Sequence, residues 1–241
     1  MLKSKICRGS VFGSYSSSFT GMIDDIRKNL KNNQVNACDV GSLDGKHSFI
    51  IAKFGFKVDC YETNSLYING GNVDYPFIYN NNIKYEKIEV YGLKKRLKLK
   101  FNTNCDNITP VEKNFYTDNN KQYDFVYTYR SLSRECYSDI TMNEKIKKLK
   151  DSVKEKGILY IEYLIETENE KDPNRFLKKG QMEKYFNCKG WKIFYCSEGD
   201  YYVKENPNLI YNDFHYHNIG RIKVMKDKNK KLDFYKVNLF F

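Results

Sequence analysis

The sequence predicts an α/β protein with a doubly wound, mostly parallel seven-stranded sheet and helices on both faces. Three observations support this prediction. Short apolar runs alternate with amphipathic stretches of helical period, a glycine-rich turn follows the first apolar run, and an acidic residue ends the next one. In open α/β sheets a ligand binds at the carboxyl ends of the strands, near the point where the strand order reverses.

The composition fits one folded domain. The chain has 241 residues, of which 41% are hydrophobic and 29% charged, enough for one well-packed core. We expect a single domain over residues 1–241, with a helical segment at 1–34, an insertion-like connection at 65–95 and a strand extension at 226–241. No apolar run reaches the length of a membrane span, and no signal-peptide block opens the sequence. We therefore expect a cytoplasmic protein without membrane association.

The cysteines, histidines and charges narrow the choice of ligands. The seven cysteines include no C-x-x-C pair, and His215 and His217 stand in an H-x-H with no cysteine nearby, so we expect reduced thiols and no metal site. The net charge of +11 makes nucleic acid a possible partner. The chain has 34 lysines but only 7 arginines, although arginine is the better ligand for phosphates. A general compositional bias is therefore an alternative explanation of the positive charge.

Apolar periodicity defines the elements of the first half of the chain. Thr20 can cap a helix, and the short apolar run before the first glycine predicts a buried strand. The predicted elements are a helix at 20–32, a strand at 35–40, a helix at 48–54, a strand at 57–61 and a possible extra strand at 83–90.

Residues 97–101 alternate between apolar and basic side chains. This pattern predicts a strand with one face in water, placed at the sheet edge, where lysines deter pairing with other chains.

The second half of the chain continues the alternation. Gly157 follows an amphipathic stretch in the position of a C-cap glycine, and a continuous apolar run comes next. The predicted elements are a strand at 123–129, a helix at 141–154, a strand at 158–165, a helix at 181–188, and strands at 191–196 and 221–225.

The strongest functional signal is a glycine turn after the first strand and an acid after the second. Gly41 and Gly45 let the backbone turn tightly and approach a ligand. Glu62 can accept hydrogen bonds from both hydroxyls of a ribose. We expect Glu62 to stand exposed at its strand end, so that its replacement would leave the fold intact.

Together with Asp39, these residues resemble the opening D-x-G-x-G-x-G signature of class I S-adenosylmethionine-dependent methyltransferases. The resemblance implies S-adenosylmethionine as cofactor, with Asp39 on its methionine ammonium side and the loop from Gly41 through Ser42 to Gly45 beneath it. It also places Glu62 on the ribose. Leu43 departs from the pattern, because it stands where the middle glycine is expected.

Later segments extend this resemblance over most of the chain. Asp106 resembles the acid that contacts the adenine amino group after the edge strand, and residues 176–193 are similar to the late helix–strand unit of tellurite-resistance-type members. Tyr129, Arg130, Ser131 and Arg134 follow the fourth strand, where the fold places substrate-facing groups. The first three are our substrate candidates.

Two other functions stay open. A dinucleotide reductase would need a glycine three residues after Gly45, where this sequence has Ser48. A non-catalytic subunit of the same fold could bind RNA or a protein partner. Motifs that define the methyl acceptor are absent, so the sequence identifies neither the acceptor nor a catalytic base.

Overall fold

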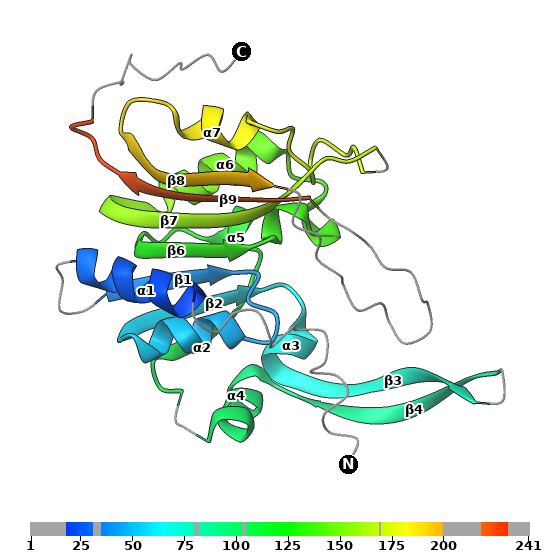
Figure 1. Ribbon diagram of the computed structural model, residues 1–241. Coiled ribbons are helices and arrows are strands. Elements are labelled where there is room, and N and C mark those ends of the chain that lie inside the picture. The colour runs from blue at the N-terminus through cyan, green and yellow to red at the C-terminus, as the bar shows by residue number, and fades with distance from the viewer. Residues whose placement is uncertain are drawn as a thin grey trace.

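A computed structural model describes residues 18–30, 35–79, 82–102, 105–168, 170–199 and 218–230 (Figure 1). Seven strands form one sheet in the order β5-β2-β1-β6-β7-β9-β8. Five neighbouring strands, β5 to β7, run parallel, and β9 is antiparallel to both of its neighbours. The predicted fold class is confirmed. The strands are β1 (Val35–Val40), β2 (Phe56–Glu62), β5 (Ile108–Glu112), β6 (Tyr123–Tyr129), β7 (Val153–Ile165), β8 (Trp191–Gly199) and β9 (Asn218–Lys226).

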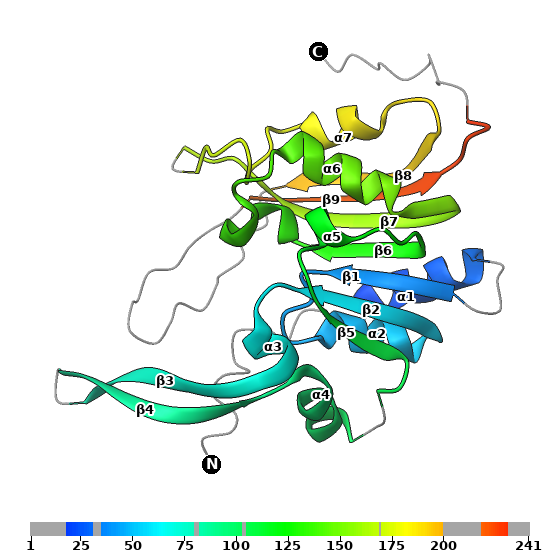
Figure 2. The ribbon, with the colours of Figure 1, turned by 180° about the vertical axis from the view of Figure 1, so that it is seen from behind.

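Helices cover both faces of this sheet (Figures 1 and 2). Successive β1 residues point to opposite faces: Ala37 packs in one core and Cys38 in the other. The first core contains residues of α1 (Ser18–Asn29), α2 (Lys46–Lys53) and α4 (Leu93–Phe101). The second contains residues of α5 (Phe115–Asp118), α6 (Met142–Asp151) and α7 (Gln181–Phe186). Among the described residues no helix is long and apolar enough to cross a membrane.

A two-stranded arm extends from the body of the protein (Figures 1 and 2). It follows the short helix α3 (Ser65–Asn69) and consists of β3 (Gly70–Tyr79) and β4 (Asn82–Tyr91), which pair antiparallel. The extra strand expected at 83–90 is confirmed as β4, whereas its partner β3 was not foreseen. An isolated hairpin is only marginally stable in water, so contacts at the root of the arm have to hold it.

The edge strand expected at 97–101 is wrong. These residues end helix α4, and the strand at that edge of the sheet is β5. Leu93 and Leu97, one helical turn apart, are buried in the core, while Leu99 is 63% exposed. The alternation of Leu97, Leu99 and Phe101 over five residues fitted a strand, but burial follows the helical spacing that begins at Leu93.

Two predicted helix boundaries are also corrected. Thr141 begins α6 with a capping box to Glu144, but the helix ends at Asp151, and Gly157 lies inside β7. The strand starts early because Val153 already pairs with Tyr123. At the other end of the chain α1 begins at Ser18, so Thr20 lies within the helix and not at its cap. The strands predicted at 35–40 and 123–129 have those bounds, and the other remaining elements occur in their expected places with shifted ends.

Candidate functional site

The predicted cofactor residues meet where the strand order reverses, between β1 and β6. Val40, near the carboxyl end of β1, pairs with Tyr61 of β2 on one side and Thr128 of β6 on the other. Glu62 and Tyr129 end these two neighbouring strands. This is the point at which doubly wound sheets bind their ligands.

Both predicted cofactor glycines of the loop after β1 have positive φ angles, 74° at Gly41 and 77° at Gly45. A Cβ on Gly41 would lie 2.9 Å from the Cβ of Ser131. A Cβ on Gly45 would lie 2.8 Å from Cδ1 of Leu93. The loop therefore needs glycine at these positions for its own conformation and for packing against the protein.

Leu43 adopts the conformation that a glycine would favour. Its φ angle is 48°, a left-handed conformation that costs energy for a side chain with a Cβ, and the side chain is 39% exposed. Two hydrogen bonds hold it there. The Leu43 amide donates to Oε2 of Glu62 at 3.0 Å, and Nη2 of Arg96 donates to the Leu43 carbonyl at 3.2 Å. The departure from the glycine pattern thus leaves the loop conformation in place.

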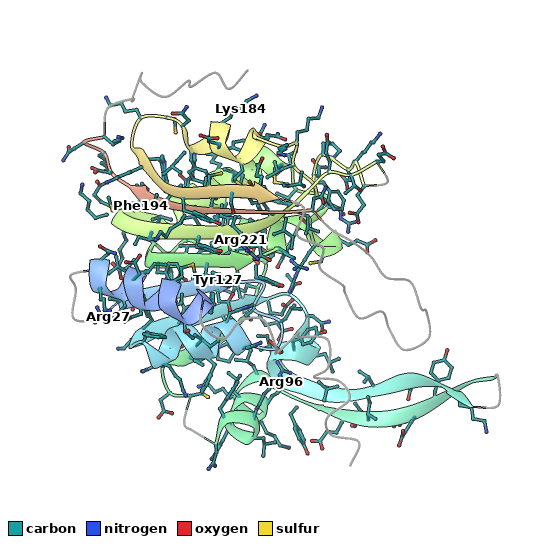
Figure 3. The ribbon with its side chains drawn as sticks, viewed as in Figure 1. Arg27, Arg96, Tyr127, Lys184, Phe194 and Arg221 are labelled. Carbon is teal, nitrogen blue, oxygen red and sulfur yellow. The ribbon has the colours of Figure 1, made fainter. Side chains whose placement is uncertain are left out.

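Arg96 joins this loop to the root of the arm (Figure 3). Its guanidinium also donates to the carbonyls of Asp44 (3.4 Å), Tyr91 (2.8 Å) and Tyr67 (3.1 Å). The side chain is buried. Sequence analysis did not find this role. The available signal was an arginine inside a lysine run of an arginine-poor protein, and arginine is the residue whose planar fork serves several acceptors at once.

Glu62 is buried, with 2% exposure, so the expectation of an exposed carboxylate is wrong. The loop and the segment after β2 close over the strand end. Besides Leu43, the amides of Thr63 (3.0 Å) and Asn64 (3.3 Å) donate to its Oε1. Nη1 of Arg134 donates to its Oε2 at 2.8 Å, forming an ion pair. Replacement of Glu62 by alanine would leave Arg134 without this partner in a largely buried place.

Arg134 comes from the loop after β6, between the short 3-10 helices η3 (Ser131–Ser133) and η4 (Glu135–Tyr137). Its Nη2 donates to the carbonyl of Gly41 at 3.0 Å. Burial opposes its charge, but the Glu62 carboxylate more than compensates and raises the pKa of the guanidinium. Arg134 therefore links the loop after β6 to two parts of the predicted cofactor site, the carboxylate of Glu62 and the glycine loop at Gly41.

Asp39 lies in β1, one residue before the end of the strand, and is 1% exposed. The hydroxyl of Ser48, at the start of α2, donates to its Oδ2 at 2.6 Å. Burial raises the pKa of Asp39 from its ordinary value of 3.8 to about 7, although Ser48 and Arg134 act in the opposite direction. A nearby cation would favour the ionised form.

The residues predicted to contact the substrate lie at the end of β6. Tyr129 ends the strand, and Arg130 follows with a φ angle of 55° and its guanidinium 4.7 Å from the ring centre of Tyr129. Glu162 of β7 accepts a hydrogen bond at 3.2 Å from Nε of Arg130 and another at 2.8 Å from Nε of Arg221. This buried carboxylate pairs with both arginines, and of the two Arg130 lies beside Tyr129.

Ser131 is buried and serves the structure of its own loop. Its Oγ is 2.6 Å from the hydroxyl of Tyr116 and also hydrogen-bonds Oγ1 of Thr128. The structure brings Ser131 against Gly41 but engages its hydroxyl within the protein.

Two buried hydroxyls, Ser42 Oγ in the loop and Ser133 Oγ after β6, have no hydrogen-bond partner within the described part of the protein. Burial raises the pKa of Tyr137, although a hydrogen bond with Thr63 acts in the opposite direction, so its hydroxyl stays protonated. Buried polar atoms are almost always paired. The unmade hydrogen bonds therefore suit a polar ligand.

Asp106 is not brought to this site. It precedes β5, and β5 runs parallel to β2 with Ile108 opposite Val58 and Glu112 opposite Glu62. Asp106 thus lies at the amino end of the sheet, by a cavity of about 320 Å³ that Phe49 and Lys53 also line. Asp106 was expected at the adenine because the edge strand was placed at 97–101. Since the edge strand is β5, which follows Asp106, this assignment is wrong.

The described residues contain no cluster of three or more potential metal ligands. His215 and His217 lie outside the described residues, as do residues 231–241 of the expected strand extension and parts of the expected segment 1–34.

Solved structures share this fold at low sequence identity. TehB from Haemophilus influenzae matches with a TM-score of 0.55 and 15% identity over 89% of this chain and 64% of its own, so the chain spans less than two thirds of that relative. Magnesium protoporphyrin IX methyltransferase (ChlM) from Synechocystis, solved with bound SAM, has a TM-score of 0.52 and 12% identity over 87% of this chain and 80% of its own. The [4+2]-cyclase SpnF matches at 0.54 and 10%, over 86% and 80%. No protein-family model and no curated protein sequence matches.

Proposed function

We propose that the protein is an S-adenosylmethionine-dependent methyltransferase whose cofactor binds at the switch point between β1 and β6. One observation supports this most directly. The glycine loop, the carboxylate of Glu62 and the unpaired hydroxyl of Ser42 gather at that point, in a fold shared with a methyltransferase solved with bound SAM.

The residues divide the work of binding by their chemistry. Glu62 accepts hydrogen bonds from the ribose hydroxyls, and the Ser42 hydroxyl, buried in the loop, offers a further hydrogen bond. Asp39 serves the ammonium side of the methionine portion, where the positive charge of the ligand favours the ionised carboxylate against the burial that raises its pKa to about 7. When bound, S-adenosylmethionine supplies an electrophilic methyl group on a sulfonium.

The protein's contribution to methyl transfer is the alignment of the acceptor. Holding two reactants in line supplies much of the rate acceleration for such a displacement. Tyr129 and Arg130, at the end of the strand next to the loop, are the candidates for this positioning. A general base is needed only where the acceptor retains a proton of high pKa, and we assign none.

We propose nucleic acid as one class of acceptor. Four lysines of α4 support it: Lys94, Lys95, Lys98 and Lys100 are all exposed on one short helix beside the loop that Arg96 holds. Binding of RNA or DNA would then weaken steeply with salt, because the lysines release counterions from phosphates. A flat salt response, or no binding at low salt, would favour a small-molecule acceptor.

We also propose a cytoplasmic location. The six cysteines within the described segments are all free thiols, which suits a reducing compartment.

Turnover tests the proposed activity. The protein would be incubated with labelled S-adenosylmethionine and fractionated RNA or metabolites from a cell extract, and S-adenosylhomocysteine would be measured. We expect formation above background with at least one fraction, and loss of that activity in Glu62→Gln. A protein that binds the cofactor but never forms S-adenosylhomocysteine would instead be a non-catalytic subunit of this fold.

A further inference from the structure

The carboxylate proposed to bind the ribose already has a full set of hydrogen-bond donors. Oε1 of Glu62 accepts from the amides of Thr63 and Asn64, and Oε2 accepts from the amide of Leu43 and from Arg134. An ionised carboxylate has about four acceptor sites. Each ribose hydroxyl that donates to Glu62 therefore has to replace one of the present donors, so at least one of them must leave.

Arg134 is the donor best able to leave. The other three are backbone amides, held by the end of β2, the start of α3 and the loop after β1. Arg134 is the one side chain among them. A long side chain can turn away by rotating about its own bonds, whereas removing an amide would require the strand end or the loop to unfold.

The backbone around Arg134 is tied down independently of its side chain. Nζ of the buried Lys145 donates to the carbonyl of Leu132 at 2.9 Å, and Nε of Arg175 donates to the carbonyl of Ser133 at 3.0 Å. The guanidinium can thus leave Glu62 while the loop stays in place.

Arg134 also spans the site itself. One guanidinium nitrogen contacts Glu62 and another contacts the carbonyl of Gly41, so the side chain bridges the ribose-binding acid and the start of the glycine loop. A Cβ placed on Gly41 would lie 3.3 Å from Cζ of Arg134, which shows how closely the guanidinium packs on the loop.

We propose that Arg134 is a latch on the cofactor site that must be displaced when an S-adenosyl nucleoside binds. This inference rests on the proposed function. The bound ribose replaces the guanidinium on Glu62, so the apparent affinity for the nucleoside includes the cost of breaking the Arg134 contacts. The latch lowers affinity and favours compounds that bring a hydroxyl donor to the acceptor site on Oε2 that Arg134 leaves.

The test compares Arg134→Gln with the parent protein and with Arg27→Gln, a control that removes an arginine of α1 whose guanidinium donates to the carbonyl of Leu30 and does not contact Glu62. Affinity for S-adenosylhomocysteine is measured by calorimetry. We expect Arg134→Gln to bind at least threefold more tightly than the parent, and Arg27→Gln to bind like the parent. Equal or weaker binding by Arg134→Gln would overturn the latch, and weaker binding would make Arg134 a ligand of the cofactor.

A second measurement separates a latch from a merely structural ion pair. Arg134→Gln should lower the Tm of the ligand-free protein, because Glu62 loses its partner, and saturating S-adenosylhomocysteine should shrink this difference. An equal loss of Tm with and without ligand would contradict the latch. Arg134→Lys, which keeps the charge but cannot reach both acceptors, should have intermediate affinity. Absence of binding by parent and variants alike would overturn the proposed function and the latch with it.

Discussion

The guanidinium of Arg96 donates to the carbonyl of Leu43, 53 residues earlier in the sequence, at 3.2 Å. This contact connects the helix after the arm to the loop proposed to carry the cofactor. It also explains how a leucine keeps the left-handed conformation for which the related signature has glycine, since Glu62 holds the amide of the same residue.

Leu43→Gly should be tolerated or stabilising. Glycine removes the cost of a positive φ angle, about 1 kcal/mol, and the leucine side chain is too exposed to add much burial. The greater backbone freedom of glycine in the unfolded chain offsets part of the gain. Leu43→Ala is the matched control, because it shortens the side chain but keeps the strain. In urea unfolding we expect the glycine variant to be the more stable of the two; the reverse order would show that the Leu43 side chain contributes through packing.

Arg96→Met should destabilise the protein by roughly 2 kcal/mol or more, because four carbonyls lose a buried donor. The loop should loosen as well, and S-adenosylhomocysteine should bind more weakly. Lys95→Met, on the adjacent position, removes an exposed ion pair with Glu89 and should change the free energy of unfolding by about 0.5 kcal/mol at most. Similar effects of the two substitutions would contradict the role of Arg96.

Asp39 should make ligand binding dependent on pH. Its pKa is about 7 in the ligand-free protein, and an ammonium group beside it favours the ionised form. Binding of S-adenosylhomocysteine should therefore release up to one proton near pH 7, and affinity should fall by about tenfold for each pH unit below 7. Calorimetry in buffers of different ionisation enthalpy measures the proton release. Asp39→Asn should bind more weakly and without this dependence; a parent that releases no proton would remove Asp39 from the ammonium side.

His47 should make the folded state sensitive to acid. Burial among Phe19, Tyr127 and Tyr129 lowers its pKa from 6.5 to about 3. Its contribution to stability is therefore present above pH 6.5 and is lost as the pH falls toward 3, because the unfolded chain takes up the proton first.

Asp39 acts in the opposite direction between pH 3.8 and 7, since its raised pKa means that the folded state takes up the proton first. The parent protein alone would therefore hide the effect of His47. The comparison with His47→Phe isolates it. Below pH 6.5 the difference in free energy of unfolding should shift in favour of the variant by about 1.4 kcal/mol for each pH unit. A difference that stays constant from pH 7 to 5 would contradict the burial effect.

Much of the fold could be predicted because buried strands leave a local signature. Residues 35–40 and 123–129 are apolar, short and followed by turn residues, and both strands have those bounds. The spacing of Asp39, Gly41, Gly45 and Glu62 was likewise enough to bring these residues to one end of the sheet. Their roles toward a ligand stay predictions.

The failures have a common physical cause, since contacts distant in sequence decided the outcome. Residues 97–101 have a strand-like alternation, but burial of Leu93 and Leu97 beneath Gly45 selects a helix. That error put the edge strand at 97–101 instead of at β5. Asp106 was therefore predicted at the carboxyl end of the sheet, whereas it lies at the amino end. The buried Glu62 pairs with Arg134, 72 residues away, and no local pattern could show that pairing.

Titration of the protein with S-adenosylhomocysteine, alongside Glu62→Gln and Asp59→Asn, tests the central claim most directly. Glu62→Gln keeps the shape of the buried side chain and loses its charge. Asp59, within β2 and away from its carboxyl end, contacts Lys121 and Tyr123. We predict micromolar binding by the parent, similar binding by Asp59→Asn, and at least tenfold weaker binding by Glu62→Gln, since hydrogen bonds to a charged group contribute roughly 1.5–3 kcal/mol each. Binding of NAD with no response to S-adenosylhomocysteine, or equal affinity of parent and Glu62→Gln, would contradict the account.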